Sequence, residues 1–172
     1  MKHLAAQLIL FYSLSLSTLA ASSEAKFDQT PYQEDQKVVF EFFLDDPAKT
    51  ASALFWIRSY MNTMLDEPYG MAPEFLDVKV ILHGTELVTI AKKNYEKYRD
   101  VVERMKYYHT LGFEFRVCAM AMEDYGYSAR DVQDFIVIAP SAMAEMAHWQ
   151  QQGYALIRPL VFTRTQSVED IR

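Results

Sequence analysis

The chain is poor in cysteine and glycine, and each shortage excludes a class of protein. Its 172 residues include one cysteine, Cys118, so no internal disulfide can form and the fold must be held by packing. Only five glycines are present, and neither GxGxxG nor GxxxxGK(S/T) occurs, which excludes a glycine-rich phosphate cradle. The chain also lacks GxSxG, HExxH and CxxC, the patterns typical of serine hydrolases and zinc sites.

Basic residues are too few and too scattered for a nucleic-acid-binding surface. The chain has 17 Lys and Arg against 23 Asp and Glu, a formal net charge of −6, and no block of basic residues. Hydrophobic residues make up 51% of the chain, which is enough for one packed core. We therefore expect one domain with no nucleic-acid partner.

The first 25 residues have the pattern of a secretory signal peptide. Lys2 gives a weakly basic start, residues 4–19 form an apolar run, and small residues precede both Ala20 and Ala25. We prefer cleavage after Ala25. An uncleaved anchor is the alternative, but the run is short for a membrane span and is interrupted by serines. We expect a periplasmic or secreted protein that has no membrane association after cleavage.

Strand and helix patterns alternate between residues 37 and 159, after a polar linker at 26–36 and before a C-terminal tail at 160–172. Apolar runs predict strands at 37–44, 77–82, 113–117, 135–139 and 155–158. Helical spacing and capping residues predict helices from 47 to the turn at 67–70, and at 87–91, 95–108, 119–123 and 142–152. This alternation favours an α/β fold, a three-layer α/β/α sandwich on a mainly parallel sheet of about five strands.

Cys118 and His83 each stand at the end of a predicted strand. In open α/β sheets the carboxyl ends of the strands are where ligands bind, so two such ends can face one crevice. Gly84 ends the second strand with His83, and Ser141 follows the fourth strand, where it can cap the next helix. The alternatives are a buried cysteine that acts as a small hydrophobe and a loop histidine held by a hydrogen bond.

The residues around Cys118 bear on its reactivity. Arg116 is its neighbour on the same strand face, and the N–H groups of Ala119 and Met120 begin a helix; both features favour a thiolate. Two acidic residues further along that helix, Glu123 and Asp124, oppose it. Polar residues on a strand otherwise expected to be buried suggest an interface or a crevice more than a packed helix face.

Several segments together resemble the DsrE/DsrF-like family over about residues 37–159. They are the order of elements, the strand end at His83, RVCAMAMEDYGYS, and the ending FIVIAPSAMAEMAHWQQQGYALIRP. The resemblance implies an α/β/α sandwich that assembles into trimers or hexamers. In the TusD-like sulfur carriers of that family, a cysteine at the position of Cys118 carries a persulfide. Those carriers are cytoplasmic and have basic residues after the cysteine helix, whereas this chain has Glu123 and Asp124.

The first hypothesis is an exported sulfur carrier or sulfurtransferase-like protein. Cys118 would take sulfur from a donor and pass it to an acceptor protein thiol, with no metal or cofactor. The expected binding residues around it are His83, Gly84, Arg116, Ala119, Met120 and Ser141. The alternative is a non-catalytic module of the same fold, either one that binds a small ligand in the crevice or a structural oligomer without a site.

Overall fold

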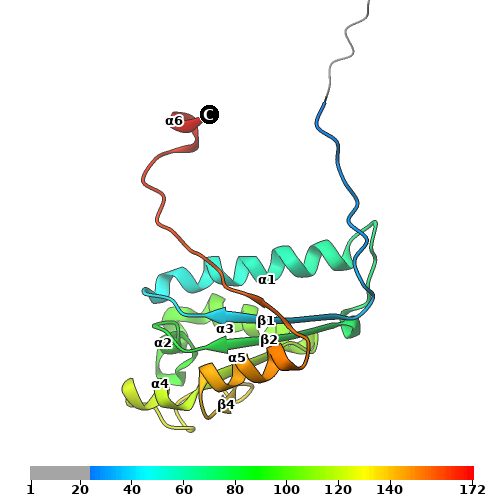
Figure 1. The fold of residues 1–172 in the computed structure, drawn as a ribbon. Coiled ribbons are helices and arrows are strands. Elements are labelled where there is room, and N and C mark those ends of the chain that lie inside the picture. The colour runs from blue at the N-terminus through cyan, green and yellow to red at the C-terminus, as the bar shows by residue number, and fades with distance from the viewer. Residues whose placement is uncertain (1–23) are drawn as a thin grey trace, which may run out of the picture. The chain divides into compact units, whose positions relative to one another are not determined.

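The computed structural model describes residues 24–172 (Figure 1). Residues 33–172 form one compact unit; the described part of the N-terminal unit, residues 24–32, contains no helix or strand. Of the predicted signal peptide, residues 1–23 lie outside the described residues. Within the described part of the chain, no helix has the length and apolar character needed to span a membrane.

One sheet of five parallel strands forms the centre of the domain, in the order β4-β3-β2-β1-β5. Its strands are β1 (Gln36–Phe42), β2 (Leu76–Leu82), β3 (Glu114–Cys118), β4 (Val137–Ala139) and β5 (Ala155–Ile157). The chain adds β2, β3 and β4 on one side of β1 and then returns to place β5 on the other side. This confirms the predicted α/β class and the parallel sheet.

Helices lie on both faces of the sheet. The described helices are α1 (Thr50–Leu65), α2 (Leu87–Ile90), α3 (Tyr95–Thr110), α4 (Ala119–Asp124), α5 (Ala142–Gln151) and α6 (Val168–Ile171), with 3-10 turns at 47–49, 73–75 and 92–94. Of these, α6 belongs to the C-terminal tail and does not cover the sheet. The long helices α1 and α3 pack on one face, and α5 packs on the other. The result is the three-layer sandwich that the sequence predicts.

The two faces of the sheet differ in chemistry. Alternate residues of the central strands, such as Phe40 and Phe115, join α1 and α3 in the large apolar core, and each fully buried side chain of this kind stabilises the fold by about 1.5–3 kcal/mol. The face toward α5 has a much smaller apolar cluster, formed by Val39, Ile81, Cys118, Ala142, Met146 and Tyr154. The central strands β1, β2 and β3 also carry charged residues on this face, among them Glu41, Lys79 and Arg116, so charged side chains lie beneath and beside α5.

Several element boundaries differ from the prediction for physical reasons. The first strand was expected to reach residue 44, but it ends at Phe42 because the Leu44 N–H bonds to a side chain, Glu86, instead of a neighbouring strand. The fourth strand is only 137–139. The expected C-terminal tail contains α6, whose start is held by a capping box between Ser167 and Asp170.

Candidate functional site

The ends of β2 and β3 bring His83 and Cys118 to facing positions. Leu82 pairs with Val117 in the parallel ladder, so the next residues, His83 and Cys118, lie opposite each other on strands that are ~4.8 Å apart. Both side chains lie on the α5 face, because Cys118 packs with Ile81 and His83 bonds to Glu41. Among the described residues, no hydrogen bond joins the thiol to the imidazole.

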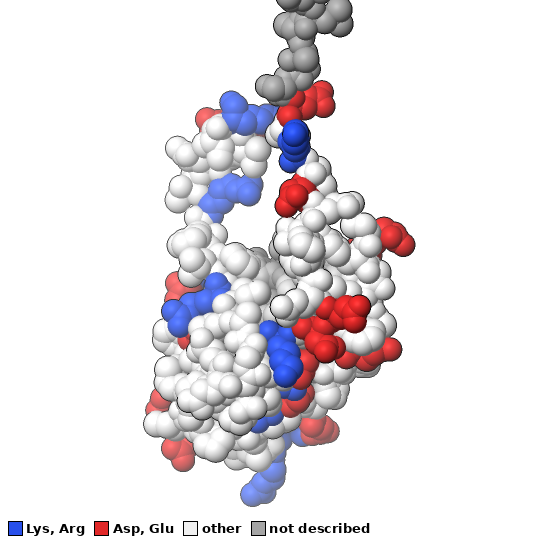
Figure 2. Space-filling model, turned by 45° about the vertical axis from the view of Figure 1, so that its right-hand side comes forward, with Lys and Arg blue, Asp and Glu red and all other residues white. Residues whose placement is uncertain are grey.

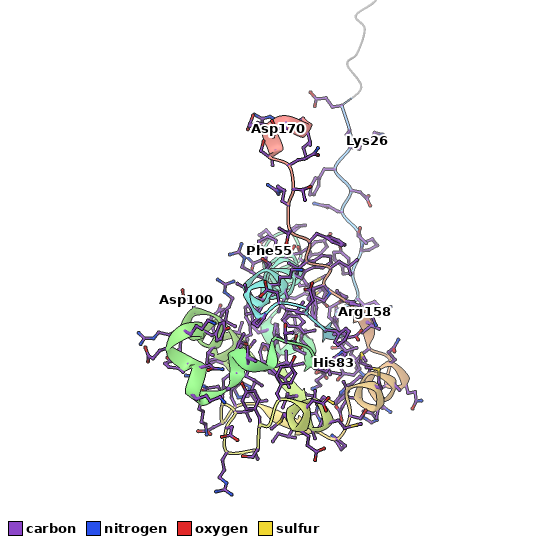
Figure 3. The ribbon with its side chains drawn as sticks, turned by 90° about the vertical axis from the view of Figure 1, so that its left-hand side faces the viewer. Lys26, Phe55, His83, Asp100, Arg158 and Asp170 are labelled. Carbon is purple, nitrogen blue, oxygen red and sulfur yellow. The ribbon has the colours of Figure 1, made fainter. Side chains whose placement is uncertain are left out.

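Glu41 of β1 holds the imidazole of His83. Glu41 Oε1 lies 3.0 Å from His83 Nε2, and Oε2 is paired with the Arg158 guanidinium just after β5. Figure 3 shows His83 and Arg158 on the same side of the domain, and Glu41, which is 3% exposed, lies between them. Burial lowers the pKa of His83 below its usual value and the Arg158 charge adds to this, although Glu41 opposes both. The net effect favours the neutral imidazole.

An aromatic ring covers the imidazole of His83. The Phe43 ring stacks on it with 4.6 Å between the ring centroids and 10° between the planes. Phe43 is itself 68% exposed, which is unusual for so large an apolar side chain. The ring therefore shields one face of the imidazole, and its own outer side remains open to solvent.

A buried carboxylate fixes the backbone of the loop that carries His83. Glu86 Oε1 accepts hydrogen bonds from the N–H groups of His83 at 2.8 Å and Gly84 at 2.7 Å, and Oε2 accepts one from the Leu44 N–H at 3.0 Å. Burial raises the pKa of Glu86, whereas these backbone donors oppose the rise. Sequence reasoning missed this residue; its only signal is an acidic side chain directly after a strand end.

Gly84 lies where the loop after β2 passes close to the backbone of the loop after β1. A Cβ at this position would lie 2.5 Å from the Leu44 backbone nitrogen and 2.7 Å from the Leu44 carbonyl oxygen. The Gly84 N–H already bonds to Glu86. The predicted binding residue Gly84 therefore serves here to let two loops meet, and its N–H is used within the protein.

Cys118 is buried at the boundary between β3 and α4. It is the last residue of β3 and is 6% exposed, in contact with a small apolar cluster that includes Ala142 and Met146 of α5. The helix that follows, which begins at Ala119 and Met120, has only six residues. So short a helix adds little dipole at the thiol.

Arg116 lies on the α5 face with Cys118, as expected, but its guanidinium is engaged elsewhere. Arg116 Nη1 lies 2.8 Å from Glu114 Oε2, and Nε lies 2.7 Å from Glu145 Oε2 on α5. Arg116 therefore contacts a packed helix rather than an open crevice, whereas the interface suggested by the polar residues of β3 stays a prediction. These two carboxylates balance the charge of Arg116, so it does little to favour the thiolate form of Cys118.

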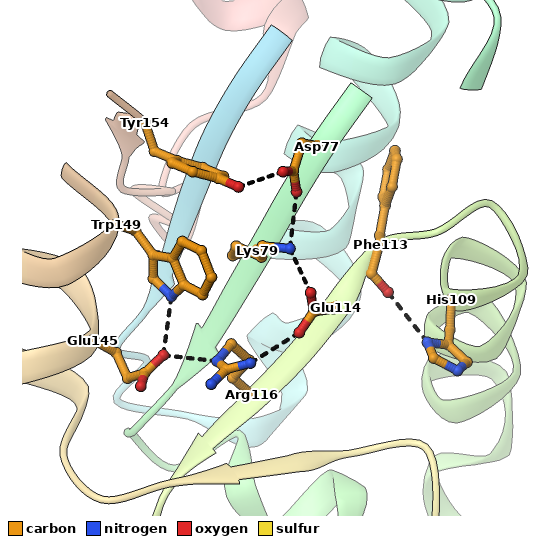
Figure 4. A network of polar contacts seen from close by, with 9 residues as sticks. All are labelled: Asp77, Lys79, His109, Phe113, Glu114, Arg116, Glu145, Trp149 and Tyr154. Carbon is orange, nitrogen blue, oxygen red and sulfur yellow. Dashed lines mark hydrogen bonds and ion pairs between the residues drawn. The ribbon is translucent and has the colours of Figure 1, made fainter. Parts of the chain in front are cut away.

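A continuous chain of polar contacts fastens α5 and the turn after it to the sheet (Figure 4). In order, it joins Tyr154, Asp77, Lys79, Glu114, Arg116, Glu145 and Trp149. Lys79 and Arg116 also lie over the Trp149 ring, at 4.9 and 5.4 Å from its centroid. This network explains why the α5 face has so little apolar core.

Ser141 occupies the N-cap position of α5, as predicted, with extended backbone angles. Its side chain makes no capping hydrogen bond, so the hydroxyl is not committed to the helix. Ser141 lies two residues beyond Ala139, which pairs with Cys118 in the sheet. The hydroxyl group thus follows the strand next to the thiol.

Two further observations concern the surface charge and the possible metal sites of the described residues. On the face shown in Figure 2, basic and acidic side chains are mixed, and no continuous basic area is visible among the residues drawn. Within residues 24–172, no three His, Cys, Asp or Glu side chains are arranged to hold a metal ion. The chemistry of the site therefore has to be considered from Cys118, His83 and Glu41.

Comparison with known proteins identifies the family. The model of the DsrE/DsrF-like family matches residues 37–159. The chain belongs to the DsrE/DsrF-like family. This family is associated with sulfur relay. No curated protein matches the chain significantly.

Two solved structures resemble this member of the DsrE/DsrF-like family. The protein of unknown function MTH1491 from Methanobacterium thermoautotrophicum is 17% identical, with a TM-score of 0.58 over 73% of this chain and 100% of that one. The ychN protein from E. coli is 12% identical, with a TM-score of 0.49 over 72% of this chain and 98% of that one. At these identities the first likeness supports the fold alone.

Proposed function

We propose that this protein is an exported sulfur carrier that holds a persulfide on Cys118. One observation carries the proposal: the only thiol of the chain stands at the carboxyl end of β3, opposite the strand-end His83, in a family associated with sulfur relay. The carboxyl ends of parallel strands are the usual place for ligands in open α/β sheets.

The proposed sulfur transfer consists of two attacks by thiolates on sulfur. The Cys118 thiolate attacks the outer sulfur of a donor persulfide, and the same sulfur later passes to an acceptor thiol that attacks it in turn. His83 orients the donor at the strand ends. The partners are therefore a donor of sulfane sulfur and an acceptor protein thiol.

Mass spectrometry of the intact folded protein tests the proposal. After reduction and incubation with polysulfide, the mass should rise by one sulfur atom, and a reductant should reverse the gain. Cys118→Ser should show no gain under the same conditions. If the wild-type protein stays unmodified, and if Cys118 is alkylated only when the protein unfolds, the carrier proposal fails.

The burial of Cys118 favours a second candidate, a binding module in which the thiol only lines the crevice. Cys118 is 6% exposed and contacts Ile81, Ala142 and Met146, which is the environment of a small hydrophobe. In that case the thiol stays unreactive toward polysulfide. A small ligand that binds the crevice would instead raise the melting temperature of the wild-type protein.

A further inference from the structure

We propose that His83 accepts the thiol proton of Cys118 and that Glu41 is the positioning residue for this proton transfer. The inference rests on the proposed sulfur transfer for its chemical context. It adds a general base and the group that orients it, which the strand-end position of the cysteine does not supply. Glu41 lies on β1, His83 directly follows β2 and Cys118 ends β3, and the side chains of all three lie on the α5 side of the sheet.

Glu41 is a buried carboxylate within an otherwise apolar stretch of β1. It lies on a central strand whose neighbours along the chain, Phe40 and Phe42, are fully buried. A buried carboxylate costs free energy unless it is paired, and Glu41 is paired on both oxygens. Oε1 faces His83 and Oε2 faces Arg158, which directly follows the residue that pairs with Phe40 in the β1–β5 ladder. Because Arg158 holds Oε2, Oε1 stays on the imidazole.

The contact with Glu41 selects one tautomer of His83. Nε2 faces an ionised carboxylate that can only accept, so Nε2 carries the hydrogen and Nδ1 is the free acceptor. No residue of the described chain bonds to Nδ1. Nor does any fully buried side-chain nitrogen or oxygen of that part lack a partner, so Nδ1 is not fully buried. A histidine that is held by a carboxylate at one ring nitrogen can use the other nitrogen to deprotonate a nucleophile.

The charges around His83 suit a base that begins neutral. Glu41 faces it from β1, Arg158 from the end of β5 and Cys118 from β3, while Glu86 holds its backbone N–H. Burial keeps the pKa of His83 below its usual value, which favours the neutral form that is able to accept a proton. Once it does, the Glu41 carboxylate stabilises the imidazolium.

The transfer step balances without an external oxidant. The Cys118 S–H gives its proton to His83 Nδ1, and the resulting thiolate attacks the outer sulfur of a donor R–S–SH. The donor S–S bond breaks as the new S–S bond to Cys118 forms. The leaving R–S⁻ then takes the proton back from Nδ1, which yields R–SH, the Cys118 persulfide and a neutral imidazole.

The pH dependence of Cys118 alkylation by iodoacetamide, measured on the folded full chain, tests the relay. Glu41→Gln should slow alkylation near neutral pH by about tenfold and move the profile to higher pH, since general bases contribute at least that much. His83→Gln should do the same, and the double variant should be no slower than His83→Gln. Because Glu41 is buried, His83→Gln also serves as the test if Glu41→Gln fails to fold. Glu103→Gln, a half-exposed carboxylate on α3 at the other face of the sheet, is the control and should keep the wild-type profile.

Persulfide loading of the same samples separates this inference from the proposed function. If His83→Gln keeps the wild-type alkylation profile while Cys118 still loads sulfur, the relay is overturned and the carrier stands. If His83→Gln shifts the profile but the wild-type protein never loads sulfur, the relay stands and the carrier is overturned. A double variant that is much slower than His83→Gln would show that Glu41 acts independently of the imidazole.

Discussion

Glu86 Oε2 accepts a hydrogen bond from the Leu44 N–H at 3.0 Å, across 42 positions of sequence. With the two bonds that Oε1 receives from His83 and Gly84, this contact ties the loop after β1 to the loop after β2. Glu41 lies on the strand that leads into the first loop, and His83 is the first residue of the second. The geometry of the candidate site thus depends on a carboxylate that never faces the thiol.

Glu86→Gln should lower the free energy of unfolding by about 1–2 kcal/mol, because the amide group of glutamine cannot accept from all three backbone donors and leaves one buried N–H unpaired. Urea denaturation at neutral pH measures this. Glu123→Gln, on the exposed side of α4, is the control and should be neutral. Equal stability of the two variants would contradict the structural role of Glu86.

Gly84→Ala should destabilise the protein more than Gly70→Ala. At Gly84 the added Cβ would meet backbone atoms of Leu44 at 2.5 and 2.7 Å, and two chain segments would have to move apart. At Gly70 the space is open, and only the positive φ of 57° opposes alanine, at a cost of about 1–2 kcal/mol. Thermal unfolding of the two variants compares these costs. The expectation fails if Gly84→Ala melts at or above the temperature of Gly70→Ala.

Acid should destabilise the network beneath α5. Burial alone would raise the pKa of Asp77 and of Glu114. Hydrogen bonds from Tyr154 and Lys79 to Asp77, and from Lys79 and Arg116 to Glu114, outweigh burial, so both pKa values lie below normal. The unfolded chain therefore binds more protons in acid than the folded one. The stabilisation is complete above the ordinary carboxyl pKa values and is lost as the pH falls through the folded ones.

In Lys79→Gln the free energy of unfolding should fall less steeply as the pH is lowered, since the substitution removes the cation that both carboxylates share. Urea unfolding at a series of pH values between about 7 and 3 measures the change. Lys92→Gln breaks an ion pair with Asp134, whose side chain is 89% exposed, and should leave the dependence unchanged. If the stability of Lys79→Gln falls as steeply in acid as that of the wild type, Lys79 does not set these pKa values.

We expect a trimer or a hexamer in solution. The family resemblance motivates this, and β4 adds a structural reason, because it is an edge strand with Val137 39% and Ile138 38% exposed. An uncovered apolar edge tends to pair with another chain. Light scattering at micromolar concentration should give a mass of three or six chains, and Ile138→Lys should reduce it. A purely monomeric wild-type protein would rule out the assembly.

We also expect the protein to be exported and cleaved. The basic Lys2, the apolar run at 4–19 and the small residues before Ala25 motivate this. Sequencing of the N-terminus of the protein recovered from the cell envelope should find Lys26, or Ala21 if cleavage follows Ala20. An intact Met1 on that protein would contradict cleavage.

The sequence by itself determined the class of fold and the position of the thiol. Apolar runs and helical spacing depend on near neighbours, so the strands around Val80 and Val117 and the helix before Gly153 could be predicted from a few adjacent residues. The same local signals put His83 and Cys118 at strand ends.

Only the tertiary structure decided what those residues contact. Glu41 looks like an irregularity inside an apolar strand until β5 returns to the far edge of the sheet and brings Arg158 to it from 117 positions away. Arg116 looks free to assist Cys118 until α5 packs and Glu145 takes its guanidinium. Strand order and helix docking are set by the packing of the whole core, and local propensity does not encode which distant side chains that packing brings together.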